Sequence, residues 1–324
     1  MTAVLTNVAT DAAAQDRIAG RVATSPIDMD RQRVPAAARY GLFFLWITAL
    51  AAGIALVVYG FGPFFQQRDQ HHLMRRFRAD VHRSANEATG LAGVTAATMA
   101  PEPNTPVGIL EVGAVRMQQV VVEGAGATQT RHAPGHVPGS AGLGQPGNSV
   151  LVGRRAAFGG PFSSLGTLRP GDKIVVTTTQ GQSVYEVAST RQIRLPGARP
   201  SSPSVLDKVY GPSRDDRLTL VTASGLLPWN HRSADVVVAT LEGTAFAPTP
   251  QGGRRDSETG TKGDRSALAA VILALAGYGF GMGASVVIYR RLRSRSAYLL
   301  TVAPVVALTV IAAETLGRLL PAWT

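Results

Sequence analysis

The sequence predicts an all-β domain, a sandwich or a barrel, carried by three membrane-spanning α-helices. Apolar residues, 45% of the chain, gather in one segment near the start and two near the end, and only 16% of the residues are charged. This distribution is typical of membrane spans and not of one large core. Between the apolar segments, short β-rich runs alternate with turns of Gly, Pro and Asp, a pattern typical of all-β folds.

The net charge of +11 and the absence of cysteine restrict the function. Many arginines flank the apolar runs, which is typical of membrane flanks. The sequence lacks the interleaved aromatic and basic residues of nucleic-acid-binding proteins, so we expect no nucleic-acid partner. Without cysteine, the chain has no disulfide, no thiolate zinc site and no cysteine nucleophile. Nothing in the sequence indicates a metal or another cofactor.

The first predicted membrane helix covers residues 40–62. It follows an Ala-rich, polar segment, residues 1–39, which we expect to be a flexible cytoplasmic tail. The run GLFFLWITALAAGIALVVYGF carries no charge and is long enough to span a bilayer. It is longer than the apolar core of a signal peptide, so we expect a retained anchor. Residues 63–107 read as a polar helical stalk and a Pro-rich linker, with His71, His72 and His82 on a solvated face.

The predicted β domain covers residues 108–244. Segments such as PGD and TQGQS separate its strands with turn-forming residues. Two histidines, His132 and His136, flank a Pro/Gly-rich turn, where we expect a structural role. The expected strands are GILEV, QQVVVEG, NSVLVGRR, DKIVVTTT, QSVYEVAS, RLTLVTAS and DVVVATLEG.

A Pro/Gly-rich linker, residues 245–265, leads to two further predicted spans, residues 266–289 and 297–320. The first of these two carries overlapping GxxxG patterns, which let helices approach closely. The partner helix is either another helix of this chain or one from a different subunit. The glycines concerned are Gly277, Gly279, Gly281 and Gly283.

The connecting loop, residues 290–296, holds Arg290, Arg291, Arg293 and Arg295. Short loops count most in the positive-inside rule, so we expect this loop in the cytoplasm. Three spans then leave the N-terminus inside and the β domain outside, in a multi-pass protein of the plasma membrane.

The string GHVPGSAGLGQPGNSVLVGRRAAFGGPF, followed by RLTLVTASG, resembles the sortase family, nearest to its actinobacterial branch called class E. The resemblance covers residues 105–243. It implies an eight-stranded β-barrel outside the cell that acts on sorting-signal peptides and cell-wall components. In this family a cysteine thiolate attacks the peptide bond, a histidine protonates the leaving amine and an arginine supports the oxyanion.

The residues that this chemistry requires are replaced. Arg154 stands where the resemblance places the histidine, and Ala223 where it places the cysteine. The arginine position falls either on Arg232, a possible remnant, or on Asp235. A methyl group forms no acyl-enzyme, and a guanidinium gives up no proton at neutral pH. We therefore expect an inactive member of the family.

Three interpretations follow. The first is a binding or scaffolding domain for an envelope peptide or wall component. The second is an enzyme with a substituted nucleophile, Ser224, although neighbouring strand residues point to opposite faces. The third is an accessory subunit that contacts a membrane partner through its glycine-rich helix. The expected groove consists of Arg154, Arg155, Thr222, Ala223, Ser224, Leu227, Trp229, His231 and Arg232.

Overall fold

The structure is a computed structural model, and it describes residues 36–89, 99–195, 205–225, 233–253, 258–292 and 295–324. The chain divides into two units after Ala49. The described part of the first unit is helical, with Thr48 Oγ1 donating to the carbonyl of Phe44 at 2.8 Å. The β domain and the helices α3 (Gly62–Thr89), α5 (Leu268–Leu292) and α6 (Arg295–Leu319) lie in the second unit.

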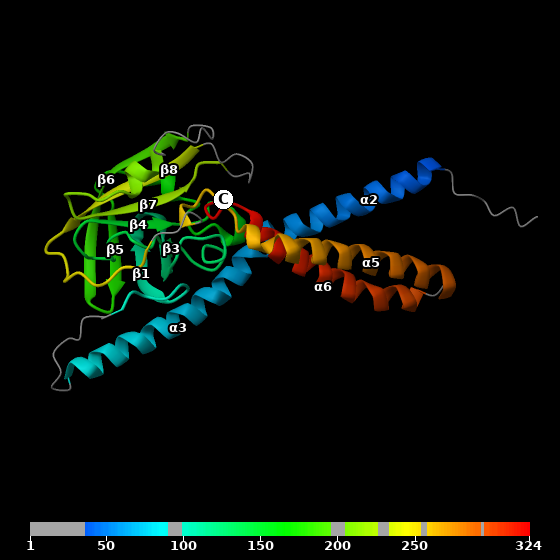
Figure 1. Cartoon of the computed structure of the whole chain (residues 1–324), viewed down its shortest axis with the longest axis horizontal. Helices are drawn as coiled ribbons and strands as arrows, with labels where there is room; N and C mark the ends of the chain where they lie inside the picture. The colour runs from blue at the N-terminus through cyan, green and yellow to red at the C-terminus, as the bar shows by residue number, and fades with distance from the viewer. Residues whose placement is uncertain (1–35, 90–98, 196–204, 226–232, 254–257, 293–294) are drawn as a thin grey trace, which may run out of the picture. The chain divides into compact units, whose positions relative to one another are not determined.

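Within the described residues, eight strands close into a barrel in the order β1-β2-β3-β4-β7-β8-β6-β5 (Figure 1). The β2–β3 and β4–β7 pairs are parallel and the other pairs are antiparallel. The barrel that the sequence predicts is therefore confirmed. The strands are β1 Pro106–Val112, β2 Met117–Glu123, β3 Gly135–His136, β4 Asn148–Val152, β5 Lys173–Thr178, β6 Gly181–Arg194, β7 Arg217–Ala223 and β8 Ser233–Glu242.

The burial pattern distinguishes peripheral strands from central ones. β1 and β5 alternate between buried and half-exposed residues, as expected of strands with one wet face. β4 is buried at every residue, and β7 at every residue after Arg217. Their inward side chains join the barrel core, whereas Val150, Val152, Val221 and Ala223 join a second cluster on the outer face. This outer cluster positions the candidate site.

Two elements escaped the sequence analysis. β3 is only two residues long and exists through its pairing with β2 and β4. The short helix α4, Val205–Tyr210, places Leu206, Val209 and Tyr210 in the outer cluster. Neither element is long enough to show a period in the sequence.

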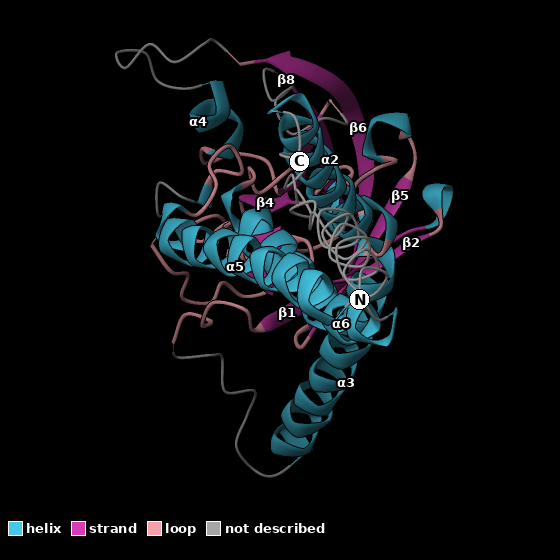
Figure 2. Ribbon diagram, turned by 90° about the vertical axis from the view of Figure 1, so that its right-hand side faces the viewer, coloured by secondary structure: helices cyan, strands magenta, loops and turns pink. Residues whose placement is uncertain are grey.

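The long helices outside the barrel are of two kinds, apolar and polar. α2 (Ala36–Ala55) continues through a π-helical turn, Leu56–Gly60, into α3 (Gly62–Thr89), and α5 (Leu268–Leu292) and α6 (Arg295–Leu319) form a hairpin (Figures 1 and 2). Two helical segments are long and apolar enough to cross a membrane, Arg265–Ile288 and Val302–Leu319. The described residues give up to three spans if the bent pair of Trp46–Gly60 with Gly62–Ser84 counts as one.

The α5–α6 contact separates the four glycines into two pairs. A Cβ on Gly277 or Gly281 would lie 3.4 or 3.0 Å from the side chain of Leu308 on α6. A Cβ on Gly279 or Gly283 would meet nothing within 4 Å among the described residues. The first pair therefore serves packing inside this chain.

The polar helix α3 lies against the barrel. Gln70 accepts a hydrogen bond from the backbone N–H of Val120 at 2.7 Å, and Gln66 donates to Gln119 at 2.9 Å. Asp69 pairs with His132 at 2.5 Å. On the other side of the helix, His71, His72 and His82 are exposed, as the sequence predicts.

Candidate functional site

The candidate site lies at the ends of β4 and β7, which are neighbouring parallel strands. Ala223 is the last residue of β7 and is completely buried. Its methyl group lies in the outer cluster together with Ala234, its partner on β8. This is the position where the resemblance places a cysteine, and the side chain present offers neither a nucleophile nor a proton.

Arg154, two residues beyond β4, is also completely buried. Its Nη2 donates to the carbonyls of Ala127 at 3.1 Å and Gly317 at 3.2 Å. The guanidinium carbon lies 5.1 Å from the ring centre of Phe158, a cation–π contact. Arg154 therefore faces the end of α6 and not an open groove.

The environment of Arg154 is costly for a cation. Burial, and then the charge of Arg131, lower the pKa of Arg154 to about 9, which leaves the side chain protonated at neutral pH. Because a buried cation needs electron-rich partners, the carbonyl at the C-terminal end of a helix is a favourable acceptor. Arg131 lies on the same helix end and donates to the carbonyl of Glu314 at 3.3 Å.

Arg155 and Asp235 form an ion pair across the site. Arg155 Nη1 lies 2.5 Å from Asp235 Oδ2, and the side chains are 20% and 12% exposed. In the register of β7 and β8, Asp235 faces Thr222. The negative charge therefore already has a partner within the chain.

The remaining predicted groove residues are only partly visible. Ser224 is half-buried, its hydroxyl contacts that of Ser233, and its backbone N–H donates to the Ser233 carbonyl at 3.1 Å. The predicted wall of the groove lies outside the described residues, namely Leu227, Trp229, His231 and Arg232.

A residue that the sequence analysis missed occupies the centre of the site. The carbonyl oxygen of Trp323 accepts hydrogen bonds from the backbone N–H groups of Arg155 at 3.0 Å and Ala223 at 3.3 Å. The Thr222 hydroxyl donates to the same oxygen at 3.4 Å. A lone Trp after a helix carries no signal of such a contact, because its partners Arg155, Thr222 and Ala223 lie far away in the sequence.

A second polar cluster lies inside the fold. Ser140 Oγ is 3.0 Å from His136 Nε2, and His136 Nδ1 is 2.8 Å from Glu123 Oε2. The three side chains are buried, and the Ser140 hydroxyl also donates to Val137 and accepts from the N–H of Val150. This chain of hydrogen bonds ties β2, β3 and β4 together and has no access for a substrate, in agreement with the structural role expected for His136.

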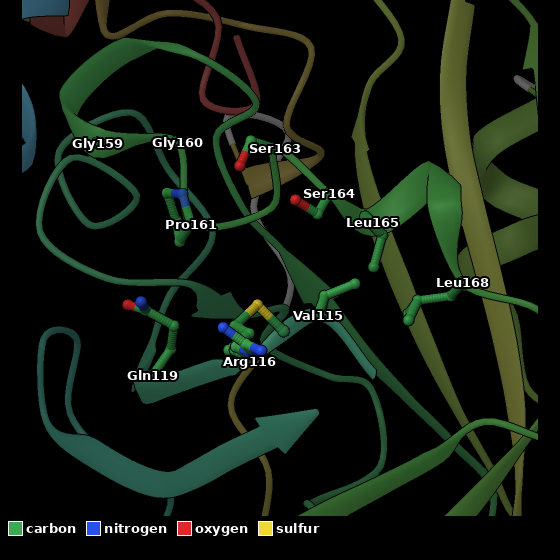
Figure 3. A pocket seen from close by; sticks show the side chains of 11 residues that line it. Val115, Arg116, Gln119, Gly159, Gly160, Pro161, Ser163, Ser164, Leu165 and Leu168 are labelled. Atoms are coloured by element: carbon green, nitrogen blue, oxygen red, sulfur yellow. The ribbon is translucent and has the colours of Figure 1, made fainter. Parts of the chain in front are cut away.

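A surface pocket of about 200 Å³ lies elsewhere on the barrel (Figure 3). Arg116 and Gln119 line one side, and the loop that carries Ser163 and Ser164 lines the other. None of the residues that line it belongs to the site around Ala223. The described residues also contain no group of three or more His, Asp or Glu side chains placed to hold a metal ion.

Comparisons with known proteins agree with this architecture. Residues 110–242 match the family model of the sortase domain. The chain is 43% identical over 82 residues to Sortase SrtE1 of Streptomyces coelicolor, a match over 24% of this chain and 22% of that protein. It is 25% identical over 147 residues to Sortase D of Bacillus subtilis, a match over 44% of this chain and 73% of that protein.

Among solved structures, sortase E from Streptomyces avermitilis is similar with a TM-score of 0.36 and 25% identity, over 45% of this chain and 93% of that one. The matched residues span the barrel from β1 to the end of β8. Residues 110–242 of this chain are therefore a sortase domain.

Proposed function

We propose that this protein is anchored in the plasma membrane by its apolar helices and presents its sortase domain outside the cell. There the domain binds a peptide of the sorting-signal type or a cell-wall component and transfers no acyl group. The observation that carries this proposal is the methyl group of Ala223 at the end of β7.

The chemistry supports a binding role. Acyl transfer needs a side chain that attacks the carbonyl carbon and a group that gives a proton to the leaving amine. The methyl side chain of Ala223 has no lone pair, and Arg154 keeps its proton and bonds to main-chain carbonyls. Arg155 is paired with Asp235 through Nη1, so the carboxylate already offsets part of the charge that an oxyanion would need. The fold is retained while the residues at the expected nucleophile and proton-donor positions are unsuited to the reaction.

The hairpin of α5 and α6 supports the proposed orientation. α5 starts at the linker that leaves β8, and the residues after α6 return to the barrel at Ala223. The last residues of α5 and the first residues of α6, which belong to the predicted Arg-rich loop 290–296, therefore lie at the end of the hairpin remote from the barrel (Figure 1). If this loop is cytoplasmic, as the positive-inside rule requires, the barrel is extracytoplasmic.

Labelling tests the orientation sharply because the natural chain has no cysteine. Ser163→Cys, at an exposed barrel position, should react with an impermeant maleimide on intact cells. Ser296→Cys, in the first turn of α6, should react only after the cells are opened. The reverse pattern would contradict the proposal.

The function itself is tested with the full chain in detergent micelles. Sorting-signal peptides, amine acceptors and cell-wall fragments are offered, and both binding and acyl transfer are measured. The proposal predicts binding of at least one of these components without transfer. If none of these components binds, the proposed function is wrong. Transfer that disappears in Ser224→Ala would establish a substituted nucleophile instead.

A further inference from the structure

The residues that follow α6 are folded into the barrel. Ala322, Trp323 and Thr324 are 0%, 0% and 2% exposed. The backbone N–H and the hydroxyl of Thr324 both donate to the carbonyl of Pro321, at 3.3 and 2.9 Å, so segment 321–324 forms a tight turn. Figure 1 marks this end of the chain beside the barrel end of α6.

The turn is held at its backbone by the site described above. Two backbone N–H groups, from Arg155 and Ala223, converge on the carbonyl oxygen of Trp323. Such a pair of donors recognises any peptide carbonyl that reaches it, whatever the side chains. Both donors lie at the strand ends where the resemblance places the family's reactive groups.

The indole of Trp323 supplies the apolar part of the contact. It lies in the outer cluster with Val152, Val221 and the small pair Ala223 and Ala234. The linker covers it from the other side. A Cβ on Gly260, which has φ of +83°, would lie 3.1 Å from the indole ring and 3.0 Å from Val152. Small residues on both sides thus leave the space that one large aromatic side chain fills.

We propose that the place occupied by Trp323 is a peptide-binding site for a turn that carries a large aromatic side chain. Segment 321–324 is then the ligand that occupies this site in cis. The inference rests on the proposed function and deepens it, because it names the ligand class and shows what must leave before a peptide from another protein can enter. Indole Nε1 has no hydrogen-bond partner among the described residues, so shape and apolar contact select the side chain.

The tether makes the cis ligand a strong competitor. The α5–α6 hairpin ends directly before segment 321–324 and holds it beside the site, and we take an effective concentration on the order of 1 mM for this intramolecular ligand. A free peptide with the same contacts and a Kd of about 100 μM would therefore bind the intact chain roughly tenfold more weakly than a chain without the segment. Access to the site is controlled by the end of α6.

The first test measures binding to two forms of the chain in detergent micelles, the intact chain and one that stops after Leu320. The probe is a fluorescein-labelled peptide Arg-Leu-Leu-Pro-Ala-Trp-Thr, and the control is a scrambled peptide of the same composition. Fluorescence anisotropy should give at least tenfold tighter binding of the probe to the shortened chain, with no preference for the scrambled peptide. Equal affinity for both forms, or for both peptides, would overturn the proposal.

The second test needs no shortened chain. Thr324→Cys is a small change at a position that is 2% exposed, in a chain that is otherwise free of cysteine. Its maleimide reaction should be at least tenfold slower than that of Ser163→Cys in the folded protein, and equally fast in denaturant. If Thr324→Cys and Ser163→Cys react equally fast in the folded protein, segment 321–324 does not occupy the site, and the proposal is wrong.

The experiments distinguish a failure of the proposed binding function from a failure of the proposed peptide site. If the shortened chain binds the probe and also transfers an acyl group, the binding-only function is wrong and the peptide site stands. If envelope components bind the intact and the shortened chain alike and the probe binds neither, the peptide site is wrong and the binding function stands.

Discussion

The guanidinium of Arg154 donates a hydrogen bond of 3.2 Å to the carbonyl oxygen of Gly317, in the last turn of α6. Arg154, at the position where the resemblance places a histidine, thus connects the barrel to the helix hairpin. Arg131 makes the parallel contact with Glu314 at 3.3 Å, and the ring of Phe158 lies beneath both guanidinium groups. The barrel therefore caps the end of α6 with two cations.

Arg154→Ala should destabilise the barrel–hairpin contact. The substitution leaves a cavity and two carbonyls without their donor, which costs about 2–4 kcal/mol in the free energy of unfolding. Thermal unfolding in detergent measures the loss. Arg169→Ala, at an exposed position, is the matched control and should change the unfolding free energy by less than about 0.5 kcal/mol. Equal effects would refute the anchoring role of Arg154.

The ion pair of Arg155 and Asp235 should show strong coupling. In a double-mutant cycle with Arg155→Gln and Asp235→Asn, we expect a coupling energy of about 1–3 kcal/mol, because both side chains are largely buried. Chemical denaturation of the four variants supplies the cycle. Additive effects of the two substitutions would contradict the paired state of Asp235.

Alkaline pH should weaken the barrel through Tyr185. Burial, opposed by the hydrogen bond from the N–H of Gly144, raises the pKa of this phenol from 10.0 to about 12. Since the folded-state pKa lies above the unfolded one, the protonated phenol contributes stability that is complete below pH 10 and is lost between pH 10 and 12. The loss over this interval amounts to about 2 kcal/mol.

The comparison with Tyr185→Phe isolates this effect, because the other tyrosines are common to both proteins. Over the same pH interval, the natural protein should lose about 2 kcal/mol more than the variant in the free energy of unfolding. Parallel pH profiles would show that Tyr185 titrates alike in the folded and unfolded states.

The two glycine pairs of α5 should respond differently to a larger side chain. Gly281→Leu forces a side chain against Leu308 and should cost about 1–3 kcal/mol in thermal unfolding of the detergent-solubilised protein. Gly279→Leu meets open space within the described chain and should leave the unfolding temperature unchanged. If Gly279→Leu instead removes a co-purifying protein, the face of Gly279 and Gly283 contacts a membrane partner. Equal destabilisation by both substitutions would contradict the observed helix contact.

Local patterns in the sequence predicted most of the barrel. Short β-rich runs, bounded by turns of Gly, Pro and Asp, predicted strands at the positions of β1, β4, β5 and β7. Apolar length marked α5 and α6 in the same way. These signals are local because each strand or helix repeats one pattern over several residues. β3 and α4 are too short to repeat any pattern.

The interior of the site could not be predicted in this way. Arg154 and Ala223, which the resemblance singles out, lie just after β4 and at the end of β7, but their contacts come from Gly317 and Trp323, far along the chain. Hydrogen bonds between such distant segments depend on the tertiary fold and leave no periodicity. The sequence therefore indicated an open groove, whereas the carbonyl of Trp323 occupies the strand ends.

The most direct test of the account is an acyl-transfer assay on the full chain, with sorting-signal peptides and an amine acceptor, read by mass spectrometry of peptide and protein. A variant with Ala223→Cys and Arg154→His that stops after Leu320 restores the reactive groups and opens the site. The account predicts no transfer and no acyl adduct with the natural chain, and transfer only with the restored variant. Transfer by the natural chain, or an acyl adduct on Ser224, would contradict it.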